Sequence, residues 1–512
     1  MSLILSIPPE EMREKFLALK SARDVAALLE VKYSHLTYHL YKSTSSEKYI
    51  TFTIPKRSGG EREIKAPISA IKILQRKLNT LLQQVYKHKE PVHSYIYKHS
   101  VISNARRHVN KKWVLTVDLS NFFPTISFQR IRGMFISKPH LLGEGAATVL
   151  AQLCCCDGFL PQGAPTSPII SNMICAKLDS ELGRLSQKHK CRYTRYADDL
   201  TFSTNEAVFP ESLAKEENGG RIVIGDELAR VINDNWFIIN DNKIRLRAYD
   251  THQEATGLTV NEKVNVRRRY VKQIRAMLHS WERNGLEQAQ TDYIQKHSTK
   301  KHRNPRKPSP EFKAVLYGKL AFLKQVIGEN NPVYLRYFTQ LQRLTLLEKY
   351  QKQKDNTDHR KRGLILERLM QKMFALNQVE VYKSFRRNEN GEQIDGSCKY
   401  EGWYYLIECK WQEALSSHRD TDSLYAEIDR SGAGTWGIFI SVNGWSDNVP
   451  DLLKQNRYKG IILMNGSDIE HVLRDRVKLG ELIQAKEKHL HFKSEPYFDA
   501  ANLVRTEGSP IG

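Results

Sequence analysis

The chain has 512 residues, too many for a single hydrophobic core, so roughly two to four domains are expected. Its formal net charge of +22, from 79 Lys and Arg against 57 Asp and Glu, predicts a polyanionic partner or an acidic membrane surface. The 40% hydrophobic content excludes a disordered chain, and no apolar run approaches the ~18 residues that span a bilayer.

These features leave nucleic acid as the expected partner and argue against a membrane. The N-terminal stretch MSLILSIPPEEMREK has no basic region before its apolar run, so it is a poor signal peptide. The seven cysteines form no Cys-x-x-Cys pair and three are consecutive, which suits neither a zinc site nor a disulfide framework. We therefore expect a cytoplasmic protein without a structural metal.

The first 110 residues are patterned mostly as helices, interrupted by one β-rich insert. The insert, YITFTIPKRSGGEREIKAPIS at 49–69, predicts a strand, a Gly-Gly turn and a second strand. The apolar run WVLTVDL at 113–119 is typical of a buried strand and carries an aspartate near its tip. Residues 160–185 begin with turn chemistry and become helical after Pro-Thr-Ser-Pro. The apolar positions at helical spacing there are Ile170, Ile174, Leu178 and Leu182.

The stretch RYTRYADDLTFST at 192–204 alternates polar and apolar residues around Asp198 and Asp199. Neighbouring side chains on a strand point to opposite faces, and adjacent carboxylates repel. If Tyr-Ala-Asp-Asp is a hairpin turn, the turn breaks the alternation and both acids face one side. Asp118 from the earlier strand would complete a carboxylate cluster. Two Mg²⁺ ions about 3.5–4 Å apart could occupy it and bind the attacking hydroxyl and leaving pyrophosphate of a phosphoryl transfer.

Later segments predict a basic helix and a second domain. RRRYVKQIRAMLHSWER at 267–283 places Lys272 and Arg275 away from an apolar helix face. The basic, proline-bearing segment at 298–310 predicts a solvated loop. A polar run near 345–362 predicts the main domain boundary, and the helix and strands after it predict an α/β domain. The apolar face of the basic helix comprises Val271, Ile274, Leu278 and Trp281.

Three blocks in this order resemble the reverse transcriptases: VDLSNFFPTI at 117–126, LPQGAPTSPIISN at 160–172 and YADDLTFS at 196–203. The resemblance implies a palm in which all three aspartates bind metal, the second of the adjacent pair being the less direct ligand. It also implies deoxynucleotide substrates.

The same resemblance implies roles for residues around the acids. Phe123 would exclude a ribose 2′-hydroxyl, and Gln162 and Gly163 would lie under the incoming nucleotide, where glycine permits close backbone approach. Two further motifs match. Arg62 and Lys65, in GGEREIKAP, would grip the triphosphate, and Lys243, in INDNKIRL, would protonate the departing pyrophosphate.

Two elements resemble the retron reverse transcriptases of bacteria in particular. NARRH at 104–108 matches an Asn-Ala-x-x-His element, and ATGLTVN, beginning at Ala255, matches a Val-Thr-Gly element in which alanine replaces valine. The stretch at 317–337 is similar to the end of a retron thumb. The RNA-binding residues expected on this basis, with the basic helix included, are Asn104, His108, Thr256, Gly257, Lys272 and Arg275.

The retron resemblance implies a specific activity. Such an enzyme binds a structured noncoding RNA encoded beside it and primes from a 2′-hydroxyl within that RNA. It copies part of the RNA into single-stranded DNA that stays joined by a 2′–5′ branch. Members of the family act in bacterial defence against phages.

The C-terminal region carries a second set of acids. On the strand WYYLIECK, Glu408 and Lys410 are two positions apart and so face the same side, and Asp395 on the previous strand can meet Glu408. With Glu367 from a preceding helix, this set could bind one or two Mg²⁺ ions, and the lysine could orient water. The pattern resembles the Asp…Glu-x-Lys motif of restriction-endonuclease-like nucleases, although Gln393-Ile394 replaces the usual proline. DNA would be the substrate, and a surface ion pair is the alternative.

We therefore expect an α+β right-hand polymerase with fingers, palm and helical thumb, followed by an α/β restriction-endonuclease-like domain. Two other functions stay open: a reverse transcriptase of mobile DNA with a target-nicking tail, and an idle palm that serves as an RNA-binding scaffold for the nuclease. The oligomeric state, including a homo-oligomer, also stays open. The expected divisions are N-terminal helices and fingers at 1–110, palm at 111–260, thumb at 261–347, linker at 348–362 and nuclease domain at 363–512.

Overall fold

The computed structural model describes residues 4–56, 59–217, 220–297, 311–382, 385–386, 393–455 and 460–504. The loop predicted at 298–310 lies outside this set. Among the described residues, no helix is both long and apolar enough to cross a membrane. They divide into two compact units: the first comprises 4–271 and 322–328, and the second comprises 272–297, 311–321 and the described residues from 329 onward.

The first unit begins with short helices and the predicted β-rich insert. Strands β1 (Tyr49–Pro55) and β2 (Glu61–Pro67) pair antiparallel along their whole length, which confirms the predicted strand–turn–strand. The long helix α5 follows, and its apolar positions Leu74, Leu78, Leu81 and Leu82 are fully buried. The helices of this region are α1 (Pro9–Leu17), α2 (Ala22–Leu28), α3 (Tyr33–Thr37), the π-helical turn η1 (Tyr38–Lys42), α4 (Ser45–Lys48), α5 (Ser69–Val85) and α6 (Val101–Arg106).

An antiparallel sheet forms the middle of the first unit, with β3 (Trp113–Ser120) at its centre. Alternation along β3 sends Leu115, Val117 and Leu119 into the core, so Asp118 faces the other side. One edge of β3 pairs with β5, which pairs in turn with β4, and the other edge pairs with β8 and β9. These strands are β4 (Arg192–Tyr196), β5 (Asp199–Thr204), β8 (Ile238–Ile239) and β9 (Arg245–Ala248).

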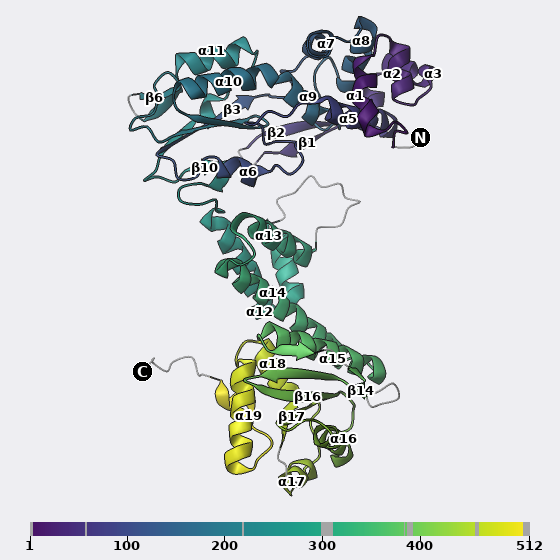
Figure 1. Ribbon diagram of the computed structural model, residues 1–512, viewed down its shortest axis with the longest axis vertical. Coiled ribbons are helices and arrows are strands. Elements are labelled where there is room, and N and C mark those ends of the chain that lie inside the picture. Colours follow the sequence, from purple (N-terminus) through teal and green to yellow (C-terminus); the bar gives the residue numbers. More distant parts are fainter. Residues whose placement is uncertain are drawn as a thin grey trace. The chain divides into compact units, whose positions relative to one another are not determined.

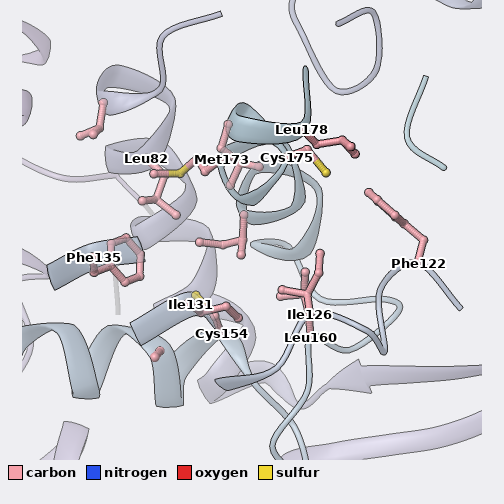
Figure 2. Close-up of a cluster of buried hydrophobic side chains, with 14 of the residues drawn as sticks. Leu82, Phe122, Ile126, Ile131, Phe135, Cys154, Leu160, Met173, Cys175 and Leu178 are labelled. Atoms are coloured by element: carbon pink, nitrogen blue, oxygen red, sulfur yellow. The ribbon is translucent and has the colours of Figure 1, made fainter. Parts of the chain in front are cut away.

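Helices cover one face of this sheet, and α6 with β10 (Glu254–Ala255) lies on the other (Figure 1). The covered face continues into a large core between the helices, part of which is shown in Figure 2. The remaining elements of the first unit are α7 (Phe128–Ile136), α8 (Glu144–Cys154), α9 (Ser167–Ile174), α10 (Ala176–Lys188), β6 (Ala214–Glu217), β7 (Arg221–Ile224), α11 (Asp226–Asp234), the 3₁₀ turn η2 (Asp241–Lys243) and β11 (Leu258–Thr259).

Long helices open the second unit. Helix α12 (Arg268–His297) begins in the first unit, and its backbone breaks at Gly285, where φ is 80°. Ile274, Leu278 and Trp281 are buried on α12 as predicted. Helices α13 (Phe312–Ile327), α14 (Pro332–Lys354) and α15 (His359–Leu376) follow.

The expected linker at 348–362 is mostly helical. Helix α14 continues to Lys354 and α15 begins at His359, so only residues 355–358 connect them. The reason is burial: Leu346, Leu347 and Tyr350 belong to the same core cluster as the C-terminal sheet. The polar sequence covers the exposed side of a helix whose other side is packed.

A five-stranded sheet forms the core of the C-terminal region, in the order β12-β15-β16-β17-β18. Strands β16, β17 and β18 are parallel and alternate between two apolar layers. Helices α14, α15, α18 and α19 pack on one face, and α16 and α17 pack on the other. The elements are β12 (Glu380–Tyr382), β13 (Phe385–Arg386), β14 (Gln393–Ile394), β15 (Gly396–Tyr400), β16 (Trp403–Lys410), α16 (His418–Asp429), β17 (Thr435–Ser441), α17 (Asn448–Gln455), β18 (Ile461–Asn465), α18 (Gly466–Leu473), α19 (Leu479–Lys493) and η3 (Ala500–Leu503).

A fully buried ion pair attaches the end of the chain to this sheet. Lys486 Nζ lies 2.8 Å from Asp468 Oδ2, and both side chains are completely excluded from solvent. The other oxygen of Asp468 accepts the backbone N–H of Ala500 at 3.0 Å, and Lys486 also donates to the Phe498 carbonyl. Residues 498–500 therefore complete the hydrogen bonding of this buried pair.

Removing one partner of this pair should strongly destabilise the second unit. We expect Lys486→Ala to lower the free energy of unfolding by about 3–5 kcal/mol, because it leaves the Asp468 carboxylate buried without a cation. Urea denaturation followed by tryptophan fluorescence measures the change. Lys478→Ala, which removes an exposed pair with Asp475, is the matched control and should leave the transition where it is.

Candidate functional site

Three aspartates converge at the tip of the β4–β5 hairpin. Ala197 and Asp198 form its two-residue turn, because Tyr196 pairs with Asp199. Ala197 has a φ of 57°, the left-handed conformation that such tight turns require. On the neighbouring strand Asp118 is the register partner of Asp199. The Leu119 N–H donates to the Asp198 carbonyl at 3.0 Å, so the turn is tied to β3.

Burial and mutual repulsion raise the pKa values of the two acids on the hairpin. Burial and then the charge of Asp118 raise the pKa of Asp198. Burial, followed by the charges of Asp198 and Asp118, raises the pKa of Asp199 to about 7. Lys243 Nζ offsets part of this repulsion, because it lies 2.8 and 2.9 Å from the two oxygens of Asp118. Asn240 Nδ2 also donates to Asp118, at 3.0 Å.

This donor set fits a divalent cation. Carboxylate oxygens are the ligands that magnesium prefers, and a cation would relieve the repulsion that raises these pKa values. In the described part of the chain, no three His, Cys, Asp or Glu side chains are already spaced to enclose an ion. At this site Lys243 engages both oxygens of Asp118, so it must share or release that carboxylate when an ion binds.

Among the predicted nucleotide-binding residues, Lys65 on β2 contacts the Gln162-Gly163 turn, and Arg62 acts on the acids. The Lys65 N–H donates to the Gln162 carbonyl at 2.9 Å, so β2 lies directly against the Gln-Gly turn. Gly163 has a φ of 128°, and a Cβ there would lie 3.0 Å from the Lys65 carbonyl oxygen, which explains the need for glycine. The charge of Arg62 lowers the pKa of Asp198, whereas Lys65 Nζ pairs with Asp157 at 2.6 Å. Phe123 packs half-buried against Phe122, with ring centroids 5.3 Å apart.

A basic groove of about 1090 Å³ lies on the open face of the same sheet and reaches Asp199. Its floor carries Thr116 and Thr201 from β3 and β5, which alternate in phase with the acids. Four arginines line it: Arg245, Arg247, Arg267 and Arg268. A groove with cations along it and acids at one end can hold a phosphate backbone with its end at the acids.

The acids predicted in the second unit also converge. Lys410 Nζ lies 2.6 Å from Glu408 Oε1, and Asp395 accepts the Cys409 N–H at 3.1 Å. Burial, followed by the charges of Asp395 and Glu408, raises the pKa of Glu367 on α15 to about 7. The four side chains therefore share one electrostatic site. Burial and then the charge of Asp395 raise the pKa of Glu408 as well.

Comparison with known proteins identifies the family. A model of the reverse transcriptase (RNA-dependent DNA polymerase) family matches residues 54–260. The retron Ec86 reverse transcriptase of Escherichia coli is 32% identical over 250 residues, which cover 48% of this chain and 73% of that protein. The chain belongs to the retron reverse transcriptases.

Two Myxococcus xanthus relatives match over a similar length. The retron Mx65 reverse transcriptase is 33% identical over 51% of this chain and 62% of its own length, and retron Mx162 is 32% identical over 51% and 59%. The chain thus spans about three fifths of the length of these two relatives. A solved telomerase from Candida albicans, in complex with a fragment of telomeric RNA, aligns over 64% of each chain at 12% identity with a TM-score of 0.31.

The residues predicted to bind RNA differ in their exposure to solvent. Thr256 and Gly257 line the basic groove. Lys272 and Arg275 are exposed on α12, in the second unit. Asn104 and His108, in contrast, have no exposed surface. The two nitrogens of His108 contact Ser203 and Thr194, each at 2.7 Å.

Direct contact between RNA and Asn104 or His108 would require this packing to open. Burial, together with nearby cations, lowers the pKa of His108 to about 3, so the ring is neutral and joins β4 to β5. The prediction that these two residues contact RNA stays a prediction, and in this structure both side chains are fully buried.

Sequence reasoning missed the arginines of the groove. Arg245 and Arg247 alternate with buried positions in IRLRA directly after Lys243, and this period of two was the available signal. Arg267 and Arg268 begin the basic run at 267–283, for which the sequence predicts only a basic helix. The family model ends at residue 260, so the acidic site of the second unit depends on its geometry alone.

Magnesium should stabilise the folded chain through the first acidic site. Binding at one hundred times the dissociation constant contributes about 2.7 kcal/mol. We expect added Mg²⁺ to raise the melting temperature of the wild type, and Asp118→Asn to remove most of the rise attributable to the first unit. Differential scanning calorimetry measures it, with Glu408→Gln as the control that removes a ligand from the other site. An equal rise in Asp118→Asn and the wild type would contradict the assignment.

Proposed function

We propose that the chain is an RNA-directed DNA polymerase of the retron type. It binds a structured noncoding RNA, primes from an internal 2′-hydroxyl and makes single-stranded DNA that stays linked to the RNA, acting in antiphage defence. The observation that carries the proposal is the convergence of Asp118, Asp198 and Asp199 at the end of a basic groove, within the segment that matches the family.

The residues of the acidic site divide the work of polymerisation. When bound, two magnesium ions would activate the attacking hydroxyl and carry charge from the leaving pyrophosphate. Asp118 and Asp198 would hold them, and Asp199 is the less direct ligand. Lys243 already lies beside Asp118, so its Nζ is placed to supply a proton to pyrophosphate. Arg62, whose charge acts on Asp198, would contact the triphosphate.

Other residues would select and align the substrates. The close approach of β2 to Gly163 builds a rigid platform of Gln162 and Lys65 for the incoming nucleotide. Phe123 would exclude a 2′-hydroxyl by steric contact. The groove arginines would hold the sugar-phosphate backbone of template and product.

Loss of one acid should abolish DNA synthesis. With the RNA that co-purifies with the protein and deoxynucleotides, the wild type should make a branched RNA–DNA product, detected by its resistance to alkali at the branch. We expect Asp198→Asn to reduce it by at least about 1,000-fold, because a single metal ligand supplies several kcal/mol to the transition state. Asp234→Asn, an exposed acid at the end of α11, should retain activity. DNA made only from an added 3′-hydroxyl primer would contradict internal priming.

For the second unit we propose a Mg²⁺-dependent nuclease that acts on DNA. The specific observation in its favour is that Glu367, Asp395, Glu408 and Lys410 share one site, with raised carboxyl pKa values. A structural ion pair at the surface would not need two further half-buried acids beside it. Asp395 and Glu408 would hold the metal, Glu367 would support it, and Lys410 would orient water.

Cleavage should depend on the lysine of this site. We expect the full-length chain with Mg²⁺ to cut DNA, and Lys410→Ala to reduce cutting by about 100-fold or more, because an oriented water is lost. Lys372→Ala, which removes an exposed cation from α15, is the matched control. Single-stranded and duplex DNA are compared by gel electrophoresis. Equal cutting by wild type and Lys410→Ala would reject the nuclease assignment.

A further inference from the structure

A second basic pocket lies in the first unit, at the end of the β4–β5 hairpin opposite to the acidic turn. The cavity measures about 450 Å³. It shares no lining residue with the groove that reaches Asp199. Four cations line it. They come from the residue after α6, the segment before β3, the turn between α10 and β4, and the start of β4: Arg107, Lys111, Lys190 and Arg192.

Positive charge is in excess at this pocket. Glu90 and Glu206 also line it, and each is paired with one cation: Arg107 with Glu90 at 3.0 Å and Lys190 with Glu206 at 3.7 Å. Among the described residues, Lys111 and Arg192 form no ion pair with a carboxylate.

The buried histidine next to the pocket reports the same excess. After burial, the charges that lower the pKa of His108 include those of Arg192, Lys111 and Arg107. Three cations from separate segments therefore act on one point. His108 itself fixes the pocket wall, because it bonds to Thr194 and Ser203, which both line the cavity.

The pocket is too far from the acids to serve the reacting strand end. Four residues of β4 separate Arg192 from the turn at Ala197, and the five steps between them span about 16 Å in an extended strand. A phosphate held in this pocket is therefore not one of those at the nucleotide pair beside Asp199. An enzyme that copies one part of an RNA and stays attached to the rest needs such a second contact, because the duplex in the groove must move with each addition.

We propose that this pocket binds the phosphate backbone of the structured RNA at a point that is not copied. The proposal depends on the proposed polymerase function and adds to it. Asn205 is exposed in the pocket beside the cations, and its Oδ1 accepts the Lys112 N–H at 3.1 Å. Its side-chain N–H can donate to a ribose 2′-hydroxyl, which favours RNA over the DNA product. Within NARRH, His108 is tied to the hairpin through Thr194 and Ser203, and its neighbour Arg107 lines the pocket.

The test replaces the two cations that have no carboxylate partner. The full-length double variant Lys111→Gln/Arg192→Gln is titrated with a fluorescent RNA hairpin over a range of salt concentrations. We expect affinity for RNA to fall about tenfold or more, and the slope of log affinity against log salt to decrease by roughly 1.5, since each lost phosphate contact removes about 0.7–0.9. Lys111→Arg/Arg192→Lys keeps both charges and should bind as the wild type does.

Controls separate this site from the active site and from general charge. Lys72→Gln/Arg76→Gln removes two exposed cations from α5 and should change affinity less than the pocket variant. Extension of an added primer on a short template should be unchanged in the pocket variant. Unaltered RNA affinity and salt slope, or an equal loss in the α5 variant, would overturn the proposal. Equal losses of extension and binding would overturn the claim of a separate site. A wild type that binds RNA but extends no primer would count against the polymerase and leave the binding comparison valid.

A DNA hairpin of the same sequence distinguishes the ligand. We expect the pocket variant to lose less affinity for DNA than for RNA, because DNA has no 2′-hydroxyl for the pocket to contact. Equal losses for both would overturn the assignment to RNA.

Discussion

The hairpin that carries Asp198 and Asp199 depends on a buried ion pair between Arg195 and Asp179. The guanidinium is completely excluded from solvent, and its Nε and Nη2 donate to the two oxygens of Asp179, each at 2.7 Å. Burial alone would lower the pKa of Arg195, but the charge of Asp179 raises it, so the cation persists. A third donor reaches Asn172 at 3.1 Å and the Ala197 carbonyl at 3.3 Å. One side chain thus joins α9, α10 and the first residue of the turn, which fixes the turn against the repulsion of its own acids.

In both acidic sites a lysine forms an ion pair with one of the carboxylates. Lys243 neutralises Asp118, and Lys410 neutralises Glu408, at 2.8 and 2.6 Å respectively. In each site one further acid keeps a pKa of about 7: Asp199 in the first and Glu367 in the second. The lysine compensates one carboxylate, and the rest of the charge is left for a cation. The lysines occupy different positions in the two folds, a 3₁₀ turn after β8 and the end of β16, so the likeness lies in the chemistry alone.

Local patterns in the sequence predict the elements that carry these sites, and they fail where tertiary burial decides. The Tyr-Ala-Asp-Asp turn predicts the hairpin, and the apolar run at 113–119 predicts the buried strand β3. His108 could not be recognised as buried, because its partners Ser203 and Thr194 are some ninety residues away along the chain. The polar run after Leu347 predicts a linker, because within residues 348–358 only Tyr350 belongs to the buried cluster that holds α14 in place. The groove arginines were predictable from the same alternation that placed Asp118, had that period been followed into β9.

The open face of the central sheet has opposite charge at its two ends, so it attracts a phosphate backbone at one end and repels it at the other. Asp118 and Asp199 are register partners at one end of β3, whereas Arg245 and Arg247 pair with Thr116 and Val114 nearer the other end. A phosphate backbone is attracted along the arginines and repelled by the acids unless a divalent cation lies between. A strand in the groove is therefore most stable when its phosphates contact the arginines and only its end, with a bound metal, reaches the aspartates. The alternation of side chains along β3 thus places Asp118 and Thr116 on one face of the sheet, with Thr116 opposite Arg245.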